Sequence, residues 1–422
     1  MNTLELVINQ SLERHPLLKT CLKNTYQYLG SKIPRRNYIP DRTFLSRPGY
    51  YFGFHDLSPW SSRGDRILAH RIPPADRRMV QVPDYVEVGW FHGSIDGDFE
   101  PIDVTTAFNW QEGARLQWVG DSEAVIYNRF NRDRLTSVLV DGPGVHTDVG
   151  RPIYTVDPRG RHALAVDFAR LGRYSLAYSY RGLARPSHNT DATLDLVDLE
   201  TGTLRSLANV SDIMQADPRP TMDGAFHFLS HATFSPLGTR VAFMHCWLTR
   251  NCRLSRLHAL DLETGEIRLL RSNDWVSHYC WLDERRILTY DEARVGRRGF
   301  RIHDIGSETI EDMARGQLIG DGHPWVSPGG RWLLVDTYPS RFMEQELILF
   351  DLLKNDKKTL FRARIPFRFR NEHRCDFHPR MSPDGTKACF DSAHEGVRSL
   401  CVLELGVGPA APKSPAEMEA VG

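Results

Sequence analysis

One short pattern recurs along the chain, and it restricts the possible folds more than any other feature. Each copy reads as a short strand, a turn and an apolar strand, as in HATFSPLGTRVAFMH (231–245) and HPRMSPDGTKACFDS (378–392). Several copies are followed by a second hairpin with a Glu-Thr-Gly turn, as in LHALDLETGEIRLL (257–270). An internal repeat indicates an architecture built from one repeated unit. The remaining copies fall at 55–71, 116–128, 154–168, 278–290 and 323–337.

The number and spacing of the copies predict the fold class. Most copies start about 40 to 55 residues after the previous one, and each supplies about four short antiparallel strands. Units of this kind and period are propeller blades. We therefore predict an all-β chain with a single seven-bladed β-propeller, and helix confined to residues 1–30 and 308–316. A pair of β-sandwiches is the alternative, but it would not explain a unit that recurs seven times.

The predicted domain organisation has three parts. Residues 1–45 form a short N-terminal helical extension, residues 46–406 the propeller, and residues 407–422, rich in Pro, Ala and Gly, a disordered tail. The last copy leaves too few strands after SLCVLEL (399–405) to complete a blade. We therefore expect the segment 46–54 to complete that blade and close the ring.

Composition excludes several classes of function. The 422 residues include 53 basic and 53 acidic side chains, a balance that argues against a general nucleic-acid-binding protein. No stretch reaches the roughly 18 apolar residues that a membrane span needs, and no apolar signal-peptide core is present near the N-terminus. The seven cysteines are scattered and contain no CxxC pair. These features predict a cytoplasmic protein.

Histidines recur at one phase of the repeat. The residue four or five positions before the turn is His55, His231, His278, His323 or His378 in five of the seven copies. The innermost strands of propeller blades line the central channel, so these imidazoles are expected to converge near the axis. Converging imidazoles suit a divalent metal or acid–base chemistry. The alternative for any single histidine is packing, with a hydrogen bond to the backbone of the next blade. Tyr154 takes this position in the third copy, and Arg115 or Leu116 in the second.

A divalent metal site is predicted from three of these histidines. His278, His323 and His378 belong to consecutive blades, so they can approach one another within the range of metal ligands. Cys375 is a candidate fourth ligand, with His373 or His231 as alternatives. A thiolate together with imidazoles would favour zinc.

Four stretches carry a resemblance to a known family. They are TTAFNWQEGARLQW (105–118), RPIYTVDPRGRHALAVDFARLGRYSLAYSY (151–180), DGHPWVSPGGRWLLVDTYP (321–339) and RCDFHPRMSPDGTKACFDSAHEGVRSLCVLEL (374–405). They resemble the propeller polysaccharide lyases that cleave ulvan, and more distantly the oligogalacturonate lyases. The similarity extends from about residue 49 to 405.

The resemblance implies β-elimination at a uronic acid, and hence an acidic oligosaccharide or polysaccharide as partner. Such a site must neutralise the C6 carboxylate, remove the C5 proton and protonate the leaving O4. The resemblance assigns Tyr178 and Tyr180 as base or acid, and Arg173 or His231 as the group that neutralises the carboxylate. Packing between blades is the alternative role for the tyrosines. The residues that would bind the sugar are Asn109, Gln111, Asn128 and Tyr174.

Two functions remain open at this point. The first is a lyase that acts on a uronic-acid-containing glycan inside the cell. The second is a non-catalytic propeller that binds a glycan or a protein partner in intracellular surface-polysaccharide metabolism. The chain contains neither a Gly-x-Ser-x-Gly elbow nor a Walker-type phosphate loop, so a serine hydrolase and a P-loop nucleotidase are not expected.

Overall fold

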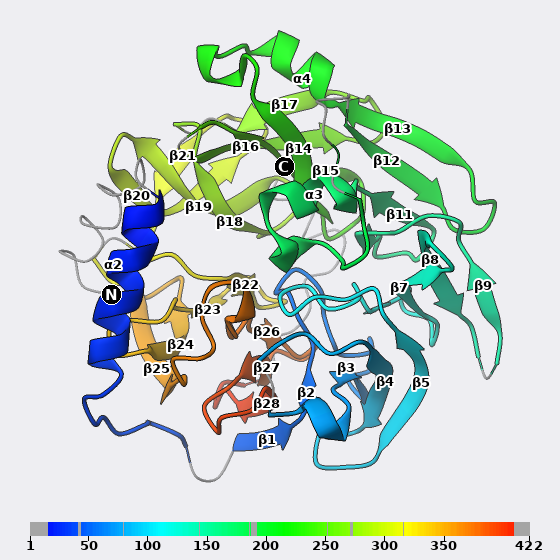
Figure 1. The fold of residues 1–422 in the computed structure, drawn as a ribbon. Helices are drawn as coiled ribbons and strands as arrows, with labels where there is room; N and C mark the ends of the chain where they lie inside the picture. Colours follow the sequence, from blue (N-terminus) through cyan, green and yellow to red (C-terminus); the bar gives the residue numbers. More distant parts are fainter. Residues whose placement is uncertain are drawn as a thin grey trace.

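The predicted propeller is confirmed. A computed structural model describes residues 16–40, 44–78, 80–142, 144–184, 186, 192–250, 252–270, 273–314 and 316–408. Within these residues the strands form seven four-stranded antiparallel sheets, arranged in a ring (Figure 1). Each sheet is one blade, and its first strand along the repeat is the innermost.

The strands of each blade follow one another in the sequence, from the axis outward, except in the last blade. Blade 1 contains β2 (Tyr50–Tyr51), β3 (Arg66–Arg71), β4 (Val86–His92) and β5 (Phe99–Thr105), and blade 2 contains β6 (Gln117–Trp118), β7 (Val125–Asn131), β8 (Arg134–Val140) and β9 (His146–Asp148). Blade 3 contains β10 (Thr155–Val156), β11 (His162–Ala165), β12 (Thr193–Asp198) and β13 (Leu204–Asn209), and blade 4 contains β14 (Phe226–Phe234), β15 (Arg240–Leu248), β16 (Arg253–Asp261) and β17 (Ile267–Leu270). Blade 5 contains β18 (Val276–Trp281), β19 (Arg286–Arg294), β20 (Arg297–Asp304) and β21 (Ile310–Asp312), and blade 6 contains β22 (Pro324–Val326), β23 (Trp332–Asp336), β24 (Glu344–Asp351) and β25 (Asp356–Arg364). Blade 7 contains β26 (Arg380–Met381), β27 (Lys387–Ser392), β28 (Ser399–Glu404) and β1 (Phe44–Pro48).

The ring closes by pairing the first described strand with the last one. Strand β1 lies antiparallel to β28, with Phe44 opposite Leu403 and Pro48 opposite Ser399. The closing strand therefore includes residues 46–48 of the expected segment and begins two residues before it, whereas Tyr50 and Tyr51 form the start of blade 1. Because closure places both ends of the propeller in one sheet, the ring can open only by breaking the hydrogen bonds between β1 and β28.

The repeated turn has a physical explanation in the hydrogen bonds of its serine. In four copies the hydroxyl accepts a hydrogen bond from the first N–H of the following strand, which fixes the start of that strand. These pairs are Ser61 with Arg66 (3.1 Å), Ser235 with Arg240 (3.0 Å), Ser327 with Trp332 (3.1 Å) and Ser382 with Lys387 (2.9 Å). The glycine three residues after each serine has a φ near +70° (Gly64, Gly238, Gly330 and Gly385), a conformation that glycine adopts without a steric penalty.

Helices are few, and one helix prediction was wrong. Helix α2 (Pro16–Gly30) lies within the segment 1–30, whose first fifteen residues lie outside the described part of the chain. The expected helix at 308–316 contains strand β21 instead, because residues 310–312 pair with β20 and this pairing outweighs local helix propensity. Two helices were not expected from the sequence, α3 (Phe168–Tyr174) and α4 (Val210–Ala216).

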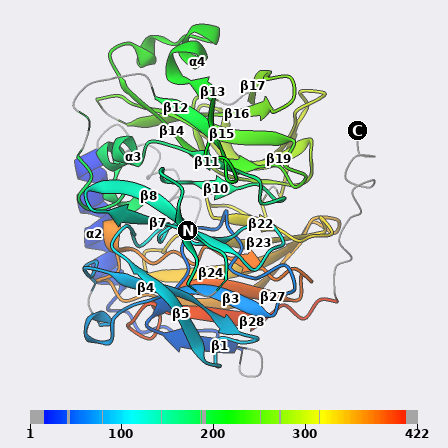
Figure 2. The same ribbon diagram turned by 90° about the vertical axis from the view of Figure 1, so that its right-hand side faces the viewer.

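Helices α2 and α3 lie on the same side of the disc (Figures 1 and 2). Helix α3 belongs to the long connection between β11 and β12, and Asp167 caps it by accepting hydrogen bonds from the N–H groups of Ala169 and Arg170. Short 3-10 turns follow at Leu176–Tyr178 (η2) and Asn371–His373 (η4). Within the described residues, no helix has the length and apolarity needed to cross a bilayer.

Candidate functional site

The structure brings all five predicted histidines together at the axis. They surround the ring of Phe54, which lies in the connection between β2 and β3. The distances from the Phe54 ring centre to the imidazole centres are 4.6 Å for His55, 5.2 Å for His231, 6.3 Å for His278, 5.9 Å for His323 and 5.0 Å for His378. We call these five residues the axial histidine cluster.

The inner strands depart from regular geometry where these imidazoles project. The pairing register of β14 with β15 shifts between Ser230 and Thr233, and His231 between them has a φ of +50°. A second shift occurs in β18, between Val276 and His278. His378, just before β26, has a φ of +45°. Bulges and left-handed backbone at non-glycine residues redirect side chains, and they concentrate at functional sites.

The second blade places an arginine where five other blades have histidine. Arg115 has a φ of +53° and a fully buried guanidinium that pairs with Asp56 at 3.0 and 2.8 Å. Its Nε donates to the Tyr154 carbonyl at 2.7 Å. Tyr154 in turn donates its hydroxyl hydrogen to Glu112 at 2.8 Å. This side of the axis therefore holds a buried ion pair instead of an imidazole.

Asp336 orients two members of the cluster from blade 6. Its carboxylate accepts hydrogen bonds from the His323 N–H (2.8 Å), from His323 Nδ1 (2.9 Å to each oxygen) and from the His378 N–H (3.0 Å). Burial alone would raise the pKa of Asp336, but the charge and hydrogen bonds of His323 lower it. Burial likewise opposes protonation of His323, yet Asp336 raises the pKa of that imidazole. In the neutral imidazole, Nδ1 carries the proton toward Asp336 and Nε2 keeps its lone pair, an arrangement typical of metal-binding histidines.

His278 has a similar carboxylate partner. Its Nδ1 lies 3.0 Å from Asp321 Oδ1, and the other oxygen of Asp321 accepts a hydrogen bond from the Ser277 hydroxyl at 2.6 Å. Burial lowers the pKa of His278, and Asp321 opposes that effect. The His323 ring centre is 4.3 Å from that of His278 and 4.3 Å from that of His378. Three consecutive blades thus present their imidazoles side by side.

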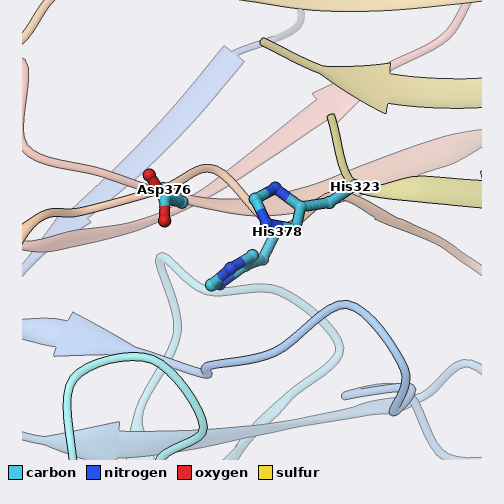
Figure 3. A group of neighbouring side chains, drawn as sticks. All are labelled: His323, Asp376 and His378. Carbon is cyan, nitrogen blue, oxygen red and sulfur yellow. The ribbon is translucent and has the colours of Figure 1, made fainter. Parts of the chain in front are cut away.

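His323, Asp376 and His378 form a group with the spacing of metal ligands (Figure 3). Their candidate ligand atoms all lie within 4.8 Å of one another. His378 Nε2 and Asp376 Oδ1 are buried and lack a hydrogen-bond partner, while the other Asp376 oxygen accepts from Arg374 Nε at 2.5 Å. Buried polar atoms are rarely left unpaired, so a cation between these groups would satisfy both of them.

The structure places Cys375 away from this group. Its side chain belongs to an apolar cluster with Phe377 and Phe369, and burial raises the pKa of its thiol to about 12. Its neighbour Asp376 faces the histidines instead. Successive side chains of an extended segment point to opposite sides, whereas residues two apart share one side. The Asp-x-His spacing of Asp376 and His378 was therefore the signal in the sequence that could have identified this carboxylate.

Tyr178 and His231 lie together on another side of the cluster. Their rings are 5.7 Å apart, and the Tyr178 hydroxyl accepts a hydrogen bond from Arg374 Nη2 at 3.0 Å. Tyr174 stacks on Tyr178 at 5.9 Å. Burial raises the pKa of Tyr178. The pKa of His231 lies well below its usual range because of burial and, next, the charge of His278.

Tyr180 and Asn128 lie in the packing between blades. Tyr180 is buried and stacks on Phe168 at 4.9 Å, and its hydroxyl accepts a hydrogen bond from Asn128 Nδ2 at 2.9 Å. The side-chain Oδ1 of Asn128 accepts from the Ile153 N–H at 3.0 Å. Both residues thus bind structural partners, and neither belongs to the axial histidine cluster.

The other residues that the resemblance assigned also have structural partners. Asn109 accepts hydrogen bonds from the N–H groups of Gln111 and Glu112 and donates to the Ser179 carbonyl. Gln111 is buried and donates to the Arg374 carbonyl at 3.1 Å. Arg173 is exposed on α3, where it donates to the Pro186 carbonyl at 3.0 Å and lies over the Phe226 ring.

Comparison with known proteins gives a likeness in fold alone. No protein-family model and no curated protein sequence matches the chain. An oligogalacturonate lyase from Vibrio parahaemolyticus superimposes with a TM-score of 0.61 at 12% identity, over 90% of this chain and 97% of that one. An oligogalacturonate lyase in complex with manganese gives a TM-score of 0.62 at 12% identity, over 88% and 96%. The chain is thus a seven-bladed propeller of the same architecture as these lyases.

Proposed function

We propose that this chain is a lyase that cleaves a uronic-acid-containing oligosaccharide by β-elimination at its axis, with the help of a divalent cation. One observation carries the proposal: two buried, unpaired ligand atoms, His378 Nε2 and Asp376 Oδ1, lie beside His323. The likeness in fold to oligogalacturonate lyases, one of them in complex with manganese, supports it. An ulvan-type substrate follows only from the resemblance of the sequence.

The ligand set fits a divalent cation. His323, Asp376 and His378 would hold it, and His278 is the nearest additional imidazole. A bound cation would polarise the substrate carboxylate and so acidify the C5 proton. Two imidazoles and a carboxylate accept either zinc or manganese, whereas a thiolate would have selected for zinc. We therefore propose a divalent cation whose identity metal analysis would determine.

His231 and Tyr178 are the proposed acid–base pair. Burial holds the pKa of His231 well below its usual range, so its imidazole is neutral near pH 7 and has a lone pair for the C5 proton. Because the same shift makes the imidazole a weaker base, the transfer would depend on the cation to acidify that proton. As that C–H bond breaks, the C4–C5 double bond forms and the C4–O4 bond breaks. The raised pKa of Tyr178 keeps its phenol protonated, so it can supply the proton that O4 takes. Arg374 holds the Tyr178 hydroxyl in position.

The test is a search for the unsaturated product in ultraviolet absorbance, with oligogalacturonides and ulvan fragments as substrates and manganese or zinc added. We expect product from the wild type and a loss of roughly a hundredfold or more in rate for Tyr178→Phe and for His231→Asn. Tyr290→Phe is the matched control, since it removes a buried hydroxyl that has no hydrogen-bond partner. An absence of product across the panel would refute the proposal.

A binding function without turnover is the second candidate. Two of the four residues that the resemblance assigned to catalysis, Tyr180 and Arg173, bind structural partners and not the axial histidine cluster, and this observation favours the second candidate. Such a propeller would bind an acidic glycan in surface-polysaccharide metabolism. Calorimetry would then detect stoichiometric binding of the same oligosaccharides with no product, and Tyr178→Phe would leave the affinity nearly unchanged.

A further inference from the structure

Helix α2 has the reverse of the usual amphipathic orientation. Its polar Gln27 is buried against the propeller and donates to the carbonyls of Pro339 (3.1 Å) and Ser340 (3.2 Å). Its leucines point the other way: Leu18, Leu22 and Leu29 are 51%, 45% and 62% exposed. Spacings of four and seven residues place these three leucines on one stripe of the helix. A helix on a globular protein normally buries such a stripe.

Two further apolar side chains of this segment are partly exposed. Tyr28 is 49% exposed, although its ring also meets Phe367 edge-on at 5.4 Å, and Ile33, just after the helix, is 51% exposed. The polar contacts that fasten this segment continue as well, because Arg35 pairs with Glu344 at 3.4 Å. The orientation of α2 is thus fixed by hydrogen bonds and an ion pair, which leave its apolar side outward. We call Leu18, Leu22, Tyr28, Leu29 and Ile33 the outer face of α2.

The segment around the outer face has a strong charge bias. Residues 16–40 contain no aspartate or glutamate, although the whole chain has equal numbers of acidic and basic residues. The basic residues of this segment are Lys19, Lys23, Lys32, Arg35 and Arg36. Lys32 and Arg36 are exposed, and the Lys32 ammonium lies 4.8 Å from the Tyr28 ring centre. An apolar helical face bordered by lysine and arginine is the combination by which interfacial helices bind anionic lipids.

We propose that α2 docks on an anionic lipid surface through its outer face. A second copy of the chain is a poorer occupant for two reasons. Five side chains cover much less than the roughly 800 Å² per partner of a stable protein interface, and two copies would bring their basic residues together. This inference does not depend on the proposed lyase function, because it rests on other residues.

Docking through α2 would also orient the axial site. Helix α2 lies on the same side of the disc as α3 (Figure 2). Gln27 of α2 donates to the Pro339 carbonyl, and the adjoining residue Tyr338 has its ring centre 5.3 Å from that of His323, so one short segment connects α2 to a proposed metal ligand. A protein held by the outer face would therefore present this side of the propeller to the lipid headgroups and to saccharides attached there.

The test is sedimentation of the full chain with phosphatidylcholine vesicles, with and without phosphatidylglycerol. We expect binding to the anionic vesicles only, weakened by salt, and reduced roughly tenfold or more in the double variant Leu22→Glu with Leu29→Glu. Leu353→Glu is the matched control, because Leu353 is an exposed leucine in the outer hairpin of blade 6. A dye on Cys21, which is exposed on α2, should report an apolar environment when the protein is bound.

Three outcomes would overturn the proposal. The first is no sedimentation with anionic vesicles at low salt. The second is equal sedimentation of the wild type and the double variant. The third is a dimer in light scattering that the double variant loses, which would assign the outer face to a second copy of the chain. Unchanged thermal unfolding of the double variant would show that the substitutions act at the surface, since both leucines are exposed.

Discussion

Replacing Asp336 by asparagine should separate the orientation of the proposed metal ligands from the stability of the fold. The carboxylate accepts hydrogen bonds from three N–H groups, two on His323 and one on His378. An asparagine that keeps its oxygen at the Oδ1 position retains both His323 contacts, but it turns an N–H₂ group toward the N–H of His378. At least one buried donor is then unpaired, and the contact with His323 loses its charge.

The expected magnitudes follow from these contacts. One buried donor without an acceptor costs about 1–3 kcal/mol, and the loss of a charge-assisted bond adds to that, so we expect a decrease of about 2–4 kcal/mol in the free energy of unfolding. Loss of the carboxylate that orients a metal-binding histidine typically weakens metal affinity about 10- to 100-fold. Urea unfolding would measure the first quantity and competition with a chromophoric chelator the second.

A second aspartate in blade 6 supplies the control. Asp351 accepts hydrogen bonds from the N–H groups of Leu353 and Lys354 in the β24–β25 turn, so Asp351→Asn should lower stability and leave metal affinity unchanged. Unaltered metal affinity in Asp336→Asn, or an equal loss of affinity in both variants, would refute the orienting role of Asp336.

Three further predictions test other parts of the structure. Burial raises the pKa of Glu112 to about 7, so its contribution to stability is complete below its usual pKa and is lost as the pH rises through 7. The free energy of unfolding of Glu112→Gln should therefore rise relative to that of the wild type by on the order of 3 kcal/mol between pH 5 and pH 8. A difference between the two proteins that stays constant with pH in urea unfolding would contradict this. Cys375→Ala should cost about 1–2 kcal/mol of stability with no change in chelator competition, whereas weaker metal binding would make the thiol a ligand. A Cβ at Gly30 would overlap the carbonyl of Arg341, so Gly30→Ala should loosen α2 and speed its proteolysis, while the same cleavage rate as in Thr25→Ala would show that this contact does not hold the helix.

The fold could be predicted because its chemistry is local. Four blades repeat a serine and a glycine whose hydrogen bond and backbone conformation define the same turn, so the interpretation of Ser382 and Gly385 also applied to the other three copies. The position of His378 relative to that turn then placed the imidazole at the axis. The repeat therefore predicted the positions of the histidines as well as those of the turns.

The rest of the site depends on how irregular segments pack. Tyr178 and Tyr180 are only two residues apart, but the first lies in η2 beside His231 and the second is buried against Phe168. The connection between β11 and β12, which contains both tyrosines, has no periodic pattern that would predict where each side chain points. Asp376 was missed for a different reason: Cys375 is the more conspicuous metal ligand by residue type, and only the two-residue spacing to His378 distinguishes them.

The most direct test of a metal-dependent lyase at the axis is a manganese titration of the chelator-treated protein with oligogalacturonide present, followed by the ultraviolet absorbance of the unsaturated product. Our account predicts no product without metal, a rise that saturates with a single bound ion, and loss of both the ion and the product in Asp376→Ala. Product formation that is independent of metal, or an ion bound with full affinity in Asp376→Ala, would contradict it.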